Sequence, residues 1–134
     1  MGCSAGDGTR GSRPADAAPA PAPLWHVTVT VSGDALPASQ VRAALERLCH
    51  AQPLMLAARY ATCRAELRYW EESPTVLEAA ALAVRLWEAQ RVPAALPDWQ
   101  VVGLEVVDRD TYHLRFEQPA LVHALVRAGD IRPF

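Results

Sequence analysis

Hydrophobic and polar residues alternate in several parts of the chain, and this alternation predicts β-strands. After Trp25, three valines occupy every second position, with His26 and two threonines between them, and the turn-forming residues 32–34 end the strand. The segment 54–72 alternates over a length that fits one long strand or a hairpin turning near residues 61–63. No Gly, Asn or Asp marks such a turn, so both alternatives stay open.

The C-terminal part of the chain predicts a second hairpin. Val101–Val107 reads as one strand, residues 108–110 as a turn, and the alternating segment Thr111–Glu117 as the last strand. A short helix over Pro119–Ala128 is expected to end at Gly129, because glycine commonly follows a helix C-terminus.

Hydrophobic residues recur at helical spacing in two longer segments. The first helix is expected to begin at Pro37 and to end before Pro53, because the residue preceding a proline avoids helical geometry. Its predicted inner face consists of Val41, Ala44, Leu45 and Leu48.

The second helix is expected to begin with a capping Ser73 followed by Pro74, and to run to about Arg91. Its stretch 79–87 is apolar nearly all round, with Arg85 as its one charge. Helices of this kind are buried on more than one side. We therefore expect this helix to pack centrally or to lie in a subunit contact.

This order of elements predicts an α+β fold: a two-layer sandwich with an antiparallel sheet and both long helices on one face. The arrangement resembles the ferredoxin-like βαββαβ fold, with an extra C-terminal hairpin and short helix as a departure. Residues 1–23 are rich in Gly and Pro and predict a disordered N-terminal tail. Residues 24–134 are expected to form a single α+β domain.

Composition narrows the class of protein. The 134 residues carry a net charge of −2, which argues against nucleic-acid binding, and no apolar run approaches the roughly 18 residues of a membrane span. Three cysteines without framework spacing, and an N-terminus without an apolar signal region, favour a reduced, cytoplasmic protein. All 13 basic residues are Arg, which suggests a GC-rich genome.

The second faces of the predicted strands form the candidate binding site. They are polar, and if the strands are neighbours they make one charged surface that also carries a tryptophan. An Arg can bind a carboxylate ligand through two parallel hydrogen bonds. The alternatives are a solvated face with cross-strand ion pairs or a contact between two sheets; an exposed Trp favours a contact. The candidate residues are Arg64, Glu66, Arg68, Trp70, His113 and Arg115.

Metal binding and catalysis have less support. Cys49 and His50 are adjacent, so on a helix they point about 100° apart, and neither C-x-x-C nor H-E-x-x-H occurs. His113 could act as a general base oriented by Glu66 or Glu117, but no nucleophile or phosphate-binding motif accompanies it. We therefore assign no metal, no cofactor and no catalytic residue.

Two stretches, ARYATCRAELRYWEE and VVGLEVVDRDTYHLRF, resemble small uncharacterised proteins of high-GC actinobacteria with a ferredoxin-like fold. The resemblance implies the fold and the cytoplasmic compartment, and it implies no activity.

Two functional hypotheses follow from the sequence. The first is a non-catalytic cytoplasmic association module, homodimeric or bound to another protein, that uses the charged, Trp-bearing sheet face. The alternative is a sensor or small enzyme whose anionic small-molecule ligand meets Arg64, Arg68 or Arg115. Neither hypothesis involves nucleic acid or a membrane.

Overall fold

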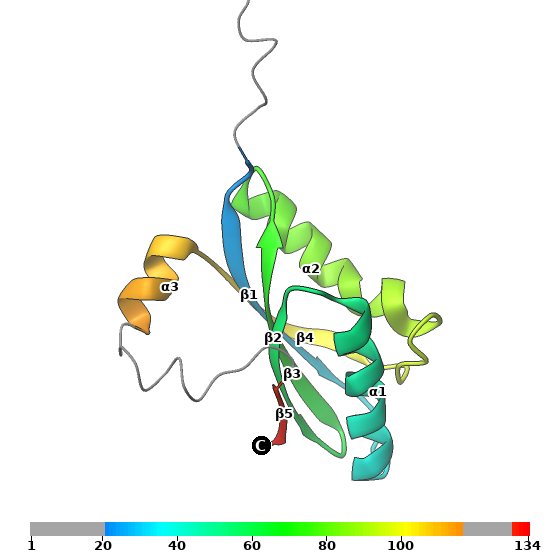
Figure 1. The fold of residues 1–134 in the computed structure, drawn as a ribbon. Helices are drawn as coiled ribbons and strands as arrows, with labels where there is room; N and C mark the ends of the chain where they lie inside the picture. Colours follow the sequence, from blue (N-terminus) through cyan, green and yellow to red (C-terminus); the bar gives the residue numbers. More distant parts are fainter. Residues whose placement is uncertain (1–20, 117–129) are drawn as a thin grey trace, which may run out of the picture.

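A computed structural model describes residues 21–116 and 130–134 of the chain. They form a mixed α+β domain with a five-stranded sheet and three helices (Figure 1). Most of the predicted tail 1–23 and the whole of the predicted helix 119–128 lie outside the described residues. Within the described ranges, no helix has both the length and the hydrophobicity to cross a bilayer.

The strands follow the order β4-β1-β3-β2-β5. The first four pair antiparallel with their neighbours, and the C-terminal β5 pairs parallel with β2. The fifth strand means that neither the strand count nor the sheet order matches the expected ferredoxin-like arrangement exactly. The strands are β1 (Leu24–Ser32), β2 (Met55–Ala61), β3 (Arg64–Glu72), β4 (Gln100–Asp108) and β5 (Asp130–Pro133).

The segment 54–72 is a hairpin, the second of the two alternatives that its alternation leaves open. Ala61 pairs with Arg64, so the loop holds only Thr62 and Cys63. Among the described non-glycine residues only Ala95 has a positive φ, so this loop does without the left-handed residues of the common two-residue turns. The Gly33 N–H and the Ser32 hydroxyl both donate to the Cys63 carbonyl, at 3.1 and 3.0 Å, and fix the loop from the side.

Helices α1 (Ala38–Ala51) and α2 (Val76–Arg91) cover one face of the sheet, as expected (Figure 1). The inner face of α1 is the predicted one. Its side chains form one core with three residues of β1 and with the inner positions of β2 and β3. The valines of this β1 row, Val27, Val29 and Val31, are fully buried.

Helix α2 begins later than the sequence predicts. Thr75, not Ser73, is the N-cap: its hydroxyl accepts a hydrogen bond from the Glu78 N–H at 3.2 Å. Ser73 is buried, and its hydroxyl donates to the Thr75 carbonyl at 3.3 Å. Thr75 with Glu78 three residues later fits the capping-box pattern, which accounts for the displaced start.

Two tryptophans fix the C-terminal end of α2 against the sheet. Trp87 of α2 stacks on Trp99, with ring centroids 6.2 Å apart, and its indole N–H donates to the Pro97 carbonyl at 3.0 Å. Trp99 lies so close to Gly33 that a Cβ on this glycine would stand 2.2 Å from the indole ring. A glycine is therefore required where the chain leaves β1.

The prediction of a final strand over Thr111–Glu117 is wrong where the structure describes it. Arg109–Arg115 forms a short helix, α3, directly after β4. Asp108 caps it, because its carboxylate accepts a hydrogen bond from the Thr111 N–H at 2.8 Å. The predicted turn at 108–110 is thus the beginning of a helix, which lies on the side of the sheet opposite α1 and α2 (Figure 1).

Candidate functional site

The polar sheet face holds four of the six predicted site residues, and a fifth, Arg115, reaches it from α3. Arg64, Glu66, Arg68 and Trp70 alternate along β3 opposite the polar positions of β1, as expected. His113 and Arg115 are on α3 and not on a strand. Arg115 still joins this face, because its guanidinium donates to the Glu105 carboxylate of β4 at 2.8 Å. Glu117 is outside the described residues.

An aromatic cluster of His26, Trp70, Tyr112 and Phe116 connects α3 to the sheet. The ring of Tyr112 lies 4.3 Å from that of His26 on β1 and 4.9 Å from that of Trp70 on β3, measured between centroids. Phe116 packs against Tyr112 at 4.8 Å. These distances are those of favourable aromatic pairs. The cluster therefore half-buries Trp70 within its own chain, where the sequence suggested an exposed side chain.

His26 is the most deeply buried member of the aromatic cluster, with 5% of its surface exposed. Burial disfavours the imidazolium, and the nearby Arg68 guanidinium disfavours it further, so the pKa of His26 falls from 6.5 to about 4. The Glu105 carboxylate acts in the opposite direction and is the weakest of the three influences. His26 is therefore neutral near pH 7 and packs as an aromatic ring.

The charged side chains of this face are largely paired with one another. Arg68 lies 3.7 Å from the Glu66 carboxylate, and Arg132 of β5 lies 2.8 Å from that of Asp130. Such pairs between exposed side chains stabilise a fold by about 0–1 kcal/mol each. Arg59 and Arg132 face each other directly across β2 and β5, which places two like charges side by side.

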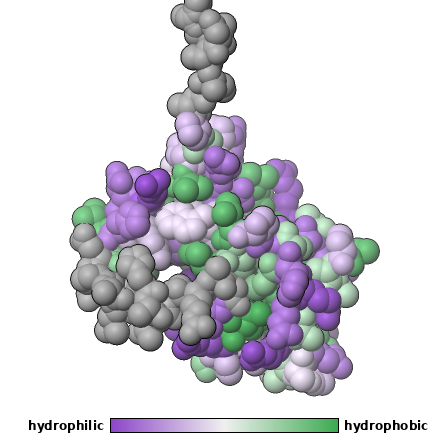
Figure 2. All heavy atoms as spheres, viewed as in Figure 1, coloured by the Kyte–Doolittle hydropathy of each residue, from purple (hydrophilic) through white to green (hydrophobic). Residues whose placement is uncertain are grey.

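A second surface, which we call the apolar edge, lies where α2 meets the outermost strand β4. Leu77 and Val84, one heptad apart on α2, are 79% and 47% exposed, and Val102 and Leu104 of β4 are 57% and 40% exposed. Only Ala79, Ala83 and Trp87 of α2 are buried, so of the two expected alternatives central packing does not hold, and a subunit contact stays a prediction. On the face seen in Figure 2, by contrast, hydrophobic residues form small patches among hydrophilic ones.

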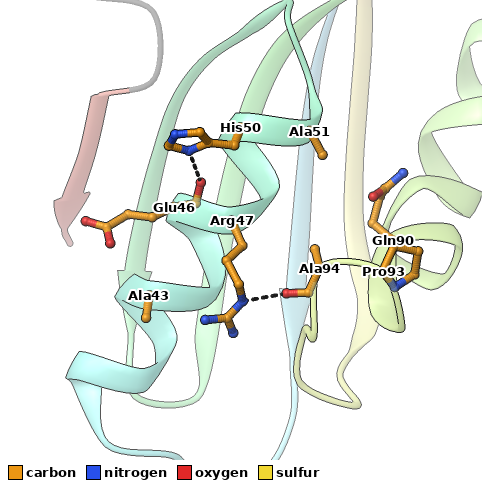
Figure 3. Close-up of a pocket in the computed structure, with 8 residues that line it drawn as sticks. All are labelled: Ala43, Glu46, Arg47, His50, Ala51, Gln90, Pro93 and Ala94. Carbon is orange, nitrogen blue, oxygen red and sulfur yellow. Dashed lines mark hydrogen bonds between the residues drawn. The ribbon is translucent and has the colours of Figure 1, made fainter.

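A groove of about 450 Å³ separates α1 from the connection that follows α2 (Figure 3). Arg47 crosses it: its Nε donates to the Ala94 carbonyl at 2.7 Å and a terminal nitrogen donates to the Ala95 carbonyl at 2.9 Å. Ala95 has a φ of 52°, a left-handed conformation that is unfavourable for alanine. Arg47 thus holds a strained loop in place, so we assign this charged residue in the groove a structural role and not a ligand-binding one.

The candidate metal-ligating residues do not come together. Among the described residues, no three His, Cys, Asp or Glu side chains are grouped closely enough to hold an ion. Cys49 and Cys63 are free thiols. Burial is the main cause that raises the pKa of the half-buried Cys49.

Three residues of the polar face, Glu105, Tyr112 and Phe116, are absent from the site that the sequence predicts. The alternation of Thr111–Glu117 places Tyr112 and Phe116 on the apolar side of a predicted strand, and Glu105 lies within the predicted strand Val101–Val107. A signal was present: Tyr112, Arg115 and Phe116 have the i, i+3, i+4 spacing of one helix face, and Asp108 precedes them as a possible cap.

The fold and these surfaces define an α+β domain with a partly covered polar face and with an edge strand, β4, whose outer side pairs with no other described strand. A family described as "Domain of unknown function (DUF8830)" matches residues 24–122, and the chain belongs to this family. Comparison with curated proteins finds no relative that matches the chain.

Proposed function

We propose that this protein is a non-catalytic association module that acts as a homodimer. The observation that carries the proposal is the outward face of α2. Its inner side is seated on the sheet by two alanines and a tryptophan, while Leu77 and Val84 point away from the core beside the exposed edge of β4. Contiguous exposed apolar surface commonly marks a protein interface.

The apolar edge leaves large apolar side chains in water. Removing apolar surface from water stabilises by about 25 cal/mol per Å², so full burial of a leucine or valine contributes about 1.5–3 kcal/mol. Four such side chains on the apolar edge, doubled by a two-fold axis, supply the apolar centre that a homodimer interface needs. Helix α1, which lies on the same face of the sheet, exposes polar residues such as Arg42 and Glu46 instead.

Analytical ultracentrifugation at micromolar concentration tests the proposal. We expect a dimer for the natural sequence and a shift to monomer for Leu77→Glu, because the new carboxylate would be buried without a partner. Gln40→Glu, which adds the same charge on the exposed side of α1, is the matched control and should remain dimeric. A monomeric natural protein, or equal effects of the two variants, would refute the proposal.

The sheet face is the other surface that could hold a second copy. Trp70 supports this surface, because its ring is only half-buried although Tyr112 packs against it. Trp70→Ala separates the two surfaces: dimers lost in this variant but retained in Leu77→Glu would place the contact on the sheet face.

An anionic-ligand site is the second candidate function. Arg59 lies directly opposite Arg132 on β5, and the Asp130 carboxylate, 2.8 Å from Arg132, neutralises only the second of these guanidiniums. An anion bound beside Arg59 would relieve the remaining contact between like charges, which supports this function. Arg68 lies on the same face, with its guanidinium 3.7 Å from the Glu66 carboxylate. Thermal-shift measurements with carboxylates and phosphate should then show stabilisation that Arg59→Ala abolishes. Arg42→Ala, which removes an exposed guanidinium from α1, is the control.

Three narrower expectations belong to the same proposal. The antiparallel order β4-β1-β3-β2 supports a ferredoxin-like core to which β5 is added. The cytoplasm is the proposed compartment, supported by the free thiols of Cys49 and Cys63. The Lys-free composition supports a GC-rich genome, and the resemblance of two stretches of the sequence to small actinobacterial proteins supports an origin in high-GC actinobacteria.

A further inference from the structure

Strand β4 is an edge strand nine residues long. On one side it pairs with β1, and on its other side no described strand pairs with it. Its outward N–H and C=O groups can therefore accept another strand, and proteins usually protect such edges. A bulge interrupts the pairing with β1 near Val102, but the pairing is continuous from Gly103 to Asp108. Most of the strand is thus regular enough to pair again.

Charge limits the register in which β4 could pair with a second β4. Residues directly opposite in an antiparallel pair lie on the same face of the sheet, whereas neighbouring residues along a strand lie on opposite faces. In a symmetric pair the two-fold axis must therefore pass through a position where a residue lies opposite its own copy, and not between two successive residues. An axis at Glu105 would place two carboxylates directly opposite, which is unfavourable. An axis at Leu104 places Glu105 opposite Gly103 instead, and the two Glu105 side chains are diagonal neighbours about 7–8 Å apart. Arg115 already neutralises each of them, with an N···O distance of 2.8 Å.

The position of α2 favours the same axis along the strand. Val84, Trp87 and Glu88 of α2 share a depression with Gln100 and Val101, so the end of α2 lies beside the beginning of β4. Leu104 is about 8–10 Å further along the strand, which corresponds to about six residues of helix. The axis at Leu104 therefore passes near Ala80 and Ala81. These small side chains allow two helices to approach closely, and Leu77 of one copy then lies opposite Val84 of the other.

The distance between the two helices agrees with this arrangement. Helix α2 packs on both β1 and β4, so its axis lies about half a strand spacing inside β4. The two-fold axis lies half a spacing outside β4. With strands 4.7–4.9 Å apart, the two α2 axes are then separated by about 10 Å, the distance at which helices pack.

We propose that a second copy of this chain binds through antiparallel pairing of β4 with β4 around Leu104, with α2 packed on α2, so that the two sheets form one continuous sheet. The inference rests on the proposed homodimer, and it adds the contact surface, the register and the symmetry. The dimer places the two α3 helices and the two Arg115–Glu105 pairs on the same face of the joined sheet.

Site-directed crosslinking tests the register. In the full chain with Cys3, Cys49 and Cys63 replaced by Ala or Ser, we would introduce Leu104→Cys and add a short bis-maleimide. Leu104→Cys should give a covalent dimer, because the axis passes beside this residue. Val106→Cys should crosslink at least tenfold less, since its two copies are four residues out of register. Leu54→Cys controls for crosslinking by random collision, because Leu54 is 47% exposed and Leu104 is 40% exposed. This variant should give no covalent dimer.

Hydrogen exchange of the natural sequence provides a test that needs no substitution. Amides of β4 should become protected as the concentration is raised through the dimerisation range, while those of β5 should not change. A dimer by ultracentrifugation with unchanged β4 exchange, or with crosslinking strongest at Val106→Cys or Leu54→Cys, would overturn this geometry and leave the association module standing. A monomer at every concentration would overturn both.

Discussion

Helices α2 and α3 pack on the same two strands, β1 and β4, from opposite faces of the sheet, but they are held by different forces. Helix α2 spans 16 residues and is seated by fully buried Ala79, Ala83 and Trp87. Helix α3 spans seven residues, none of which is buried, and is held by aromatic contacts and one ion pair. The first arrangement belongs to the hydrophobic core, and the second lies outside it. The stability of the fold should therefore depend strongly on α2 and weakly on α3.

The largest loss in the free energy of unfolding is expected for a substitution of Trp87 in α2. Trp87→Ala removes a buried indole, its stacking on Trp99 and its hydrogen bond, and should lower the free energy of unfolding by about 3–5 kcal/mol. Urea denaturation followed by far-UV circular dichroism measures it. Arg85→Ala, on the exposed side of the same helix, should change the value by less than about 0.5 kcal/mol. Similar losses in the two variants would contradict the assignment of α2 to the core.

A smaller and local effect is expected on the other face. Tyr112→Ala removes the ring that packs on His26 and Trp70, and each such pair contributes about 0.5–1.5 kcal/mol, so we expect a loss of about 1–3 kcal/mol. Hydrogen exchange should show that α3 loses protection while α2 keeps it. Leu114→Ala, at an exposed position of α3, is the control. A global loss of protection would mean that α3 is part of the core.

Lowering the pH should destabilise the protein at His26, which packs under Tyr112 of α3. Its pKa is about 4 in the folded protein and 6.5 in the unfolded chain, so between these values the unfolded state binds more protons. Stability should then be complete above pH 6.5 and should fall as the pH drops toward 4, by at most about 1.4 kcal/mol per pH unit. Urea denaturation at several pH values should show this slope, and His26→Phe should lack it. A His26 ring that titrates near 6.5 by NMR would refute the prediction.

The smallest effects on stability are expected for substitutions of the two N-cap residues, Thr75 of α2 and Asp108 of α3. Thr75→Ala should cost about 0.5–2 kcal/mol in urea denaturation, because α2 loses a cap within the cooperative core. Asp108→Ala should reduce α3 helicity, seen in NMR chemical shifts, with little effect on global unfolding. The hydrogen bond from Thr111 lowers the pKa of Asp108, so acid should weaken this cap only below the ordinary aspartate range. Asp108→Asn should retain α3, and equal global losses at the two caps would contradict the comparison.

The same contrast explains how much of the structure could be predicted from the sequence. Regular hydrophobic patterns predict strand β1, both long helices and the polar side of β3. In each of these elements the spacing of apolar residues, every second position in the strands and three to four in the helices, matches the side that is buried. The segment after Asp108 fits two periods: Tyr112, Leu114 and Phe116 alternate, while Tyr112, Arg115 and Phe116 follow a helical face. A segment of seven residues is too short for its pattern to decide. The decision comes from the Asp108 cap and from contacts with His26, which are distant in the sequence.

The apolar edge illustrates the other limit of sequence reasoning. The composition of α2 predicts burial on several sides, but whether the second side meets its own chain or another depends on where the sheet ends. The outer position of β4 in the sheet, which no local pattern reveals, leaves Leu77 and Leu104 uncovered.

The opposite edge of the sheet determines how large an assembly can become. There β5 is only four residues long, it carries the charged pair Asp130 and Arg132, and its last residue, Pro133, has no N–H to donate. A chain with two competent edges could add copies without end and grow into a fibre. In the dimer that we propose, pairing through β4 would consume the one long edge of the described sheet, so growth would stop after two copies.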